Sequence, residues 1–62
     1  MKAKVGDTIR IIDMQGEPQY AGREGVIEQI SKDPWGDTAM YGTWGGLSVY
    51  VDKDVYEIIK EA

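Results

Sequence analysis

Residues 24–31, EGVIEQIS, carry the pattern that most strongly predicts the fold of this chain. Gly22 and Gly25 form a Gly-x-x-Gly turn that leads into β-branched residues, as is typical where a sharp turn enters a strand. The alternation of apolar and polar side chains then breaks between Ile27 and Ile30. We therefore expect a strand with a β-bulge or a strong bend between these two isoleucines.

Short stretches of alternating or β-branched residues on both sides of this segment predict further strands. Stretches that contain glycine and proline separate them. These are a long loop at 14–22, a turn at 32–37, and Gly45-Gly46, which has the composition of a two-residue hairpin turn. The predicted strands cover residues 8–13, 38–43 and 47–51.

The tail from residue 52 onward permits two interpretations. Asp54 and Glu57 have the spacing of a helix capping box, and the apolar residues within 55–59 have helical spacing. The alternative is a turn followed by a last strand at 56–59. The strand is favoured, because four short strands leave an edge unpaired and this segment is the one left to cover it.

Five short strands with frequent turns indicate an all-β fold, and we expect residues 1–62 to form a single small five-stranded barrel. Trp44 is expected to pack over the Gly45-Gly46 hairpin at one barrel end, and Tyr56 to join the core. The other residues that face inward in this interpretation are Val5, Ile9, Ile11, Val26, Ile27, Ile30, Met40, Leu47, Val49, Val51 and Ile58.

The composition excludes several kinds of functional site. The chain has no cysteine and no histidine, which excludes disulfides and removes the commonest general base and transition-metal ligand. No apolar run approaches the roughly 20 residues of a membrane span, and the first residues, MKAKVGDT, lack a signal-peptide core. We expect a cytoplasmic protein, monomeric or weakly dimeric, with no cofactor, no metal ion and no membrane association.

The charge is unevenly distributed. The formal net charge is −4, and residues 1–32 carry five basic and five acidic side chains, whereas residues 33–62 carry two basic and six acidic ones. An acidic surface favours solubility and repels a polyanion. Nucleic acid is therefore a disfavoured partner, since phosphate neutralisation supplies most of the affinity of such binders.

Several motifs resemble known barrels. Residues 5–11, VGDTIRI, resemble the opening strand of many SH3-like barrels, and residues 21–27, AGREGVI, resemble the element that follows it. The Gly-x-x-Gly-Val pattern at 22–26 is also similar to the KOW motif of ribosomal and transcription-factor barrels. These resemblances imply an SH3-like fold for the predicted barrel.

A wider resemblance covers nearly the whole chain. Blocks at 11–20, 22–26, 42–46 and 54–59 occur in the order seen in a family of small bacterial proteins, common in Gram-positive genomes and mobile elements and classed as a domain of unknown function. The family implies an SH3-like barrel and implies no chemistry. The turn at 33–37 departs from it, because its Pro-Trp pair is bulkier than the short Asp/Gly turn of relatives.

Few residues offer catalytic chemistry. Asp52 and Asp54 are the closest carboxylate pair, and Asp33 and Asp37 flank a turn where oxygen ligands for a hard cation come close together. Both pairs are better explained as turn residues, because aspartate favours such positions. Without histidine or cysteine to activate a hydroxyl, we expect a protein that is not an enzyme.

The aromatic residues are the most informative remaining set. They are all tyrosine and tryptophan, which combine a large apolar body with a polar group and are favoured at interfaces. In SH3-like barrels the ligand groove lies between the first long loop and the next turn. The resulting hypothesis is a protein-interaction module that binds an unidentified protein partner through Tyr20, Trp35, Tyr41 and Tyr50.

Two alternatives remain open. One is a KOW-like nucleic-acid-binding barrel that uses the basic residues of the first half, with bases stacking on Tyr20. The other is an acidic inhibitor that occupies a basic nucleic-acid channel of a host enzyme, with carboxylates in place of phosphates. The basic set is Lys2, Lys4, Arg10, Arg23 and Lys32, and the acidic set is Asp52, Asp54, Glu57 and Glu61.

Overall fold

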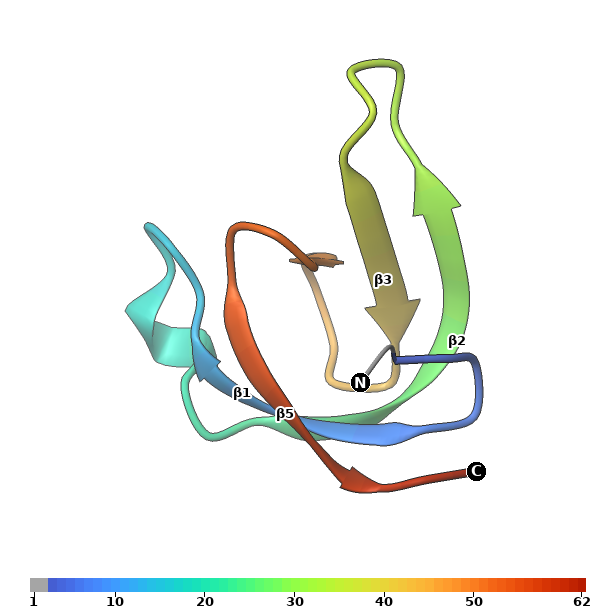
Figure 1. The fold of residues 1–62 in the computed structure, drawn as a ribbon. Helices are drawn as coiled ribbons and strands as arrows, with labels where there is room; N and C mark the ends of the chain where they lie inside the picture. The colour runs from blue at the N-terminus through green and yellow to red at the C-terminus, as the bar shows by residue number, and fades with distance from the viewer. Residues whose placement is uncertain (1–2) are drawn as a thin grey trace.

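Five antiparallel strands form a single sheet in the computed structural model, which describes residues 3–62. The sheet has the order β4-β3-β2-β1-β5, so each strand lies beside its neighbour in sequence except β5, which returns to pair with β1 (Figure 1). The all-β, five-stranded fold is therefore confirmed. The elements are β1 (Thr8–Asp13), the 3₁₀ helix η1 (Pro18–Tyr20), β2 (Glu24–Lys32), β3 (Thr38–Gly42), β4 (Val49–Tyr50) and β5 (Val55–Lys60).

The bend in β2 curls this sheet around the core. The first residues of β2 pair with β1, and its residues from Ile27 onward pair with β3. A register shift between Ile27 and Gln29 confirms the bulge expected there. Because a bulge bends the strand and increases its twist, β1 and β5 lie on one side of the molecule and β3 on the other (Figure 1).

The core is close to the predicted one in the strand centres and different at the strand ends. Five predicted residues are fully buried, namely Ile9, Ile11, Ile27, Met40 and Val49, and Ile30, Val51, Ile58 and Tyr56 pack partly buried against them. The prediction was wrong for Val5, Val26 and Leu47, which are exposed. Val26 pairs with Thr8, one residue before the inward-facing Ile9, so the alternation of β1 directs Val26 outward.

The barrel is not closed by hydrogen bonds. β4 and β5 are the two edges of the sheet, and no strand pairing joins them in the described chain. β4 is two residues long, because the connection from β3 occupies residues 43–48 and is not the predicted two-residue turn at Gly45-Gly46. Leu47 lies in this connection, which explains why it is not an inward-facing strand residue.

The tail forms a strand, as favoured from the sequence. β5 pairs with β1 so that Ile58 lies opposite Ile9 and Tyr56 opposite Ile11. Asp54 does not cap a helix. Its carboxylate accepts hydrogen bonds from the backbone N–H of Tyr50 at 2.8 Å and of Gln15 at 3.2 Å, which holds the turn between β4 and β5 against the β1–β2 loop.

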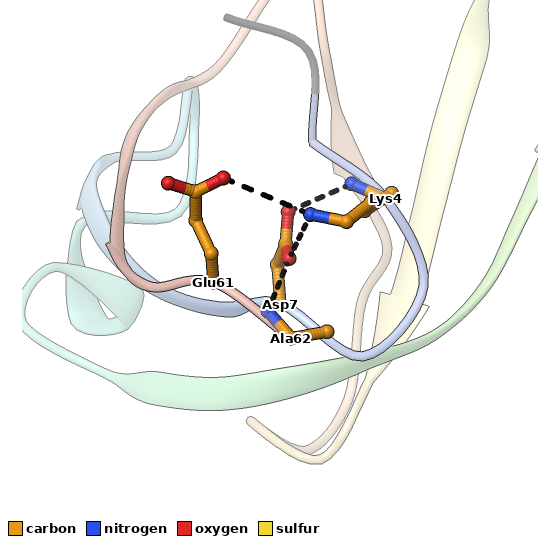
Figure 2. A network of polar contacts seen from close by, with 4 residues as sticks. All are labelled: Lys4, Asp7, Glu61 and Ala62. Carbon is orange, nitrogen blue, oxygen red and sulfur yellow. Dashed lines mark hydrogen bonds and ion pairs between the residues drawn. The ribbon is translucent and has the colours of Figure 1, made fainter.

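Asp7 joins the beginning of the described chain to its end. Its side chain is 1% exposed, and Oδ1 accepts hydrogen bonds from the Ala62 backbone N–H at 2.9 Å and from Lys4 Nζ at 3.0 Å. Oδ2 accepts one from the Lys4 backbone N–H at 3.0 Å, and Lys4 Nζ also lies 3.8 Å from Glu61 (Figure 2). The Asp7 carbonyl accepts from Ile27 in β2 at 2.9 Å. One buried residue thus connects the turn before β1, the bent strand and the segment after β5.

The substitution Asp7→Asn is expected to remove a pH-dependent part of the stability. Hydrogen bonding from the Ala62 amide, followed by that from Lys4, lowers the pKa of the Asp7 carboxyl from its ordinary 3.8, although burial opposes the shift. Because the folded-state pKa is the lower one, the charged carboxylate stabilises the fold above pH 3.8, and this stabilisation is lost as the pH falls through the folded-state value.

Urea unfolding of both proteins across pH measures this effect. The difference in unfolding free energy between wild type and Asp7→Asn should be constant above about pH 5 and shrink below about pH 4. A difference that stays the same throughout this range would show that the charge of Asp7 contributes nothing to the fold.

Candidate functional site

Trp35 lies at the tip of the β2–β3 hairpin, which extends away from the rest of the molecule (Figure 1). The indole is 83% exposed. The turn below it is ordered by Asp33, whose Oδ1 accepts hydrogen bonds from the backbone N–H of Trp35 at 3.0 Å and of Asp37 at 2.9 Å. Gly36 completes the turn with a φ of +87°, which favours glycine. The large apolar side chain of Trp35 is thus exposed to solvent on an ordered turn.

Tyr41 and Tyr50 share the outer face of the β3–β4 pair. Met40 and Val49 lie opposite each other and are buried, so Tyr50, opposite Ala39, points to the outer face, and Tyr41 points there two residues further along β3. Tyr41 is 45% exposed and Tyr50 is half-buried. We call Trp35, Tyr41 and Tyr50 the aromatic surface.

Lys53 connects Tyr50 to the base of the hairpin turn. Its Nζ lies 5.4 Å from the centroid of the Tyr50 ring and 3.1 Å from Asp37 Oδ2. Hydrogen bonding and ion pairing with Asp37 raise the pKa of the Lys53 ammonium group. The lysine is therefore held in its charged form over the tyrosine ring, and it places a cation at the margin of the aromatic surface.

Tyr20 does not belong to this surface. The structure places it in the core, 8% exposed, where its hydroxyl accepts a hydrogen bond from the Leu47 backbone N–H at 3.1 Å. The Arg23 guanidinium covers the ring at 4.2 Å from its centroid. The short helix η1 turns Tyr20 inward against Gly46, where an added Cβ would clash with the tyrosine hydroxyl. Tyr20 thus closes one end of the barrel.

Trp44 closes the same end, as expected, and it also packs on a glycine of β3. It is buried, and its Nε1 donates a hydrogen bond to the Leu47 carbonyl at 2.8 Å. The ring lies against Gly42 in β3, where a Cβ would meet the indole. The hydrogen bond to Leu47 spans the Gly45-Gly46 pair, and the contact with Gly42 adds to it.

A groove of about 260 Å³ runs between the β1–β2 loop and the β3–β4 connection. The SH3-like resemblance instead predicts a ligand groove between this loop and the turn at 32–37, and no residue of that turn lines the observed groove. Tyr50 and Lys53 from the margin of the aromatic surface line it, whereas Trp35 and Tyr41 do not. The other lining residues are Met14, Gln15, Glu17, Leu47, Ser48 and Asp54.

The basic residues proposed for nucleic acid are mostly engaged within the protein. Arg10 on β1 lies between Glu24 on β2 and Glu57 on β5, with nitrogen–oxygen distances of 2.9 Å to each. Lys4 pairs with Asp7, and Arg23 donates to the carbonyls of Trp44 and Gly45 at 3.3 Å. Lys32 has no ion pair among residues 3–62, and Lys2 lies outside the described residues.

One member of each predicted carboxylate pair holds a turn. Asp54 and Asp33 each accept two backbone N–H groups, and Asp37 pairs with Lys53. Within the described residues, no cluster of three or more potential metal-binding side chains is present. No helix in residues 3–62 is long and apolar enough to cross a membrane.

Comparison with known proteins adds no functional assignment. No protein-family model, curated protein or solved structure matches this chain. The resemblance to the small SH3-like bacterial family therefore stays a prediction, and the functional argument depends on the geometry of the site.

The sequence analysis missed two polar features. One is the buried Asp7, for which the position after Gly6 and directly before a strand is the available signal, since aspartate commonly binds nearby backbone N–H groups in such turns. The other is the contact of Tyr20 with Leu47, which joins residues far apart in the chain and has no local signal.

Tyr20→Phe tests whether Tyr20 is a structural residue. The substitution keeps the ring and removes the acceptor of the Leu47 N–H, so the free energy of unfolding should fall by about 1 kcal/mol and the Leu47 amide should exchange with solvent faster. Tyr41→Phe, at the exposed tyrosine, is the matched control and should change stability by less than about 0.5 kcal/mol. Equal effects of the two substitutions in urea unfolding would contradict this role.

Proposed function

We propose that this protein is a non-catalytic interaction module that binds a protein partner through the aromatic surface. The exposure of Trp35 carries the proposal. Trp35 is 83% exposed on a projecting hairpin, so docking against a partner would remove a large apolar area from water. Tryptophan is also enriched among the residues that dominate binding energy.

Ordering of the turn supports this function. Because Asp33 fixes the backbone N–H groups of Trp35 and Asp37, less conformational entropy is lost when the indole docks. Tyr41 and Tyr50 share one face of the β3–β4 pair and offer further aromatic area, and the charge of Lys53 at its margin is paired with Asp37.

The electrostatics favour a protein partner over the two alternatives. Arg10 and Lys4 are neutralised by carboxylates, so little free positive charge remains for phosphate groups. Two of the four carboxylates of the acidic-inhibitor alternative lie beside cations, since Glu57 pairs with Arg10 and Glu61 lies 3.8 Å from Lys4 Nζ.

Affinity capture with three versions of the chain tests the proposal. Wild type and Val5→Ala, which truncates an exposed apolar residue elsewhere, should recover the same protein from a lysate of the source organism. Trp35→Ala should reduce its recovery by about tenfold or more, because loss of a tryptophan anchor commonly costs over 2 kcal/mol. Recovery that is equal for Trp35→Ala and Val5→Ala, or lost after nuclease treatment, would contradict the proposal.

A further inference from the structure

The outer edge of β5 is open in this fold. β5 has six residues, Val55–Lys60, and pairs on one side with β1. In an antiparallel pair, every second residue directs its N–H and C=O away from the partner strand. No second strand meets β5 within residues 3–62, so these backbone groups line a free edge.

β4 cannot cover this edge. It is two residues long, and its own outward-facing groups are already used by the turn that follows. The Tyr50 N–H donates to Asp54 Oδ2 at 2.8 Å, and the Tyr50 carbonyl accepts from the backbone N–H groups of Asp54 at 2.9 Å and Lys53 at 3.3 Å. The hydrogen bonds of this turn therefore leave β4 unable to pair with β5, and the two strands remain separated by an opening.

A groove of about 530 Å³ with a mixed polar and apolar lining lies along this opening. It is lined by Val51, which follows β4, by Val55, Tyr56 and Ile58 of β5, and by Asp54. Tyr56 and Ile58 face the core, opposite Ile11 and Ile9. Apolar side chains of an added strand would continue this inner layer, and its backbone would pair with β5.

The charge around the groove determines which strand fits. Residues 52–61 carry four acidic side chains and two basic ones, and one of the basic ones, Lys53, is held by Asp37. Asp52 lies close enough to Tyr56 to contribute, after burial, to a raised pKa of its hydroxyl. The end of the groove near Asp52 and Asp54 is therefore acidic, and a net charge of −4 on each chain opposes pairing with a second copy.

We propose that the free edge of β5 and the groove beside it bind an extended peptide segment of a partner protein, which adds as a sixth strand. The segment has apolar residues at alternate positions and lysine or arginine at the end that meets Asp52 and Asp54. This surface is distinct from the aromatic surface, and strand addition of this kind combines backbone pairing with side-chain pockets.

Two synthetic heptapeptides test the proposal by NMR titration of the labelled full chain. Their sequences are Thr-Val-Thr-Val-Thr-Lys-Lys and Thr-Val-Thr-Val-Thr-Glu-Glu. Antiparallel pairing brings the charged end to Asp52 and Asp54. The lysine peptide should shift the amides of Val55–Lys60, and the glutamate peptide should bind about tenfold more weakly. The lysine peptide can be N-methylated at every second amide in two versions, one for each alternating set of N–H groups. Only the version that methylates the N–H groups facing β5 should lose binding.

Val55→Lys and Ile59→Lys form a matched pair on the same strand. Val55 lines the groove and is 53% exposed, whereas Ile59 is 38% exposed and lies outside the groove. Val55→Lys should weaken the lysine peptide about fivefold or more, because it removes apolar contact and adds repulsion, while Ile59→Lys should leave affinity within about twofold. Trp35→Ala should leave it unchanged, which separates this proposal from the aromatic surface.

Each of the following outcomes would overturn the proposal. The first is a folded spectrum that neither peptide perturbs at millimolar concentration. The second is a result that locates binding elsewhere, whether by shifts centred on Trp35, Tyr41 or Tyr50 or by equal effects of the two lysine substitutions. The third is a concentration-dependent shift of the β5 amides without peptide, together with a dimer in sedimentation, because the edge would then be occupied by a second copy.

Discussion

Asp7 carries a carboxylate into the interior of a very small protein, and the arrangement of both ends of the described chain depends on satisfying it. Three N–H donors converge on its two oxygens, one from Ala62 after β5 and two from Lys4 before β1. A buried charge without such partners would be strongly unfavourable. The carboxylate therefore holds β5 beside β1 in a chain that has no cysteine to form a disulfide.

A second part of the molecule is closed in a different way. Tyr20 and Trp44 fill it with aromatic rings, and both form hydrogen bonds with the backbone of Leu47. The Tyr20 hydroxyl accepts from its N–H, and Trp44 Nε1 donates to its carbonyl. Each ring packs where a glycine leaves space, Tyr20 at Gly46 and Trp44 at Gly42. Two of the six aromatic residues are thus structural, and this removes Tyr20 from the candidate binding residues.

The unequal lengths of the strands create the two exposed features on which the functional proposals depend. β2 has nine residues and pairs with β3 beyond the bulge, so the hairpin projects and carries Trp35 into solvent. β4 has two residues, so β5 keeps a free edge. The hairpin lies in the β2–β3 part of the sheet and the free edge at β5 beyond β1, and they present different chemistry, an aromatic anchor in one case and backbone groups beside a groove in the other.

Local patterns in the sequence determined the elements of this protein. Two-residue periodicity located β1, the break in alternation located the bulge in β2, and Asp, Pro and Gly located the turn at 33–37, whereas β5 was favoured only because an edge of the sheet needed a partner. The first three features depend on neighbouring residues, so they are readable without the fold.

Tertiary structure decided which side chains are buried at the ends of the strands and which surfaces remain free. Val26 and Leu47 are apolar but exposed, whereas Asp7 and Tyr20 are buried by partners far away in the chain. The open edge of β5 likewise depends on how the turn at Asp54 satisfies β4. The reason is physical: burial and strand pairing are set by the curvature of the whole sheet and by long-range hydrogen bonds, which no local pattern encodes.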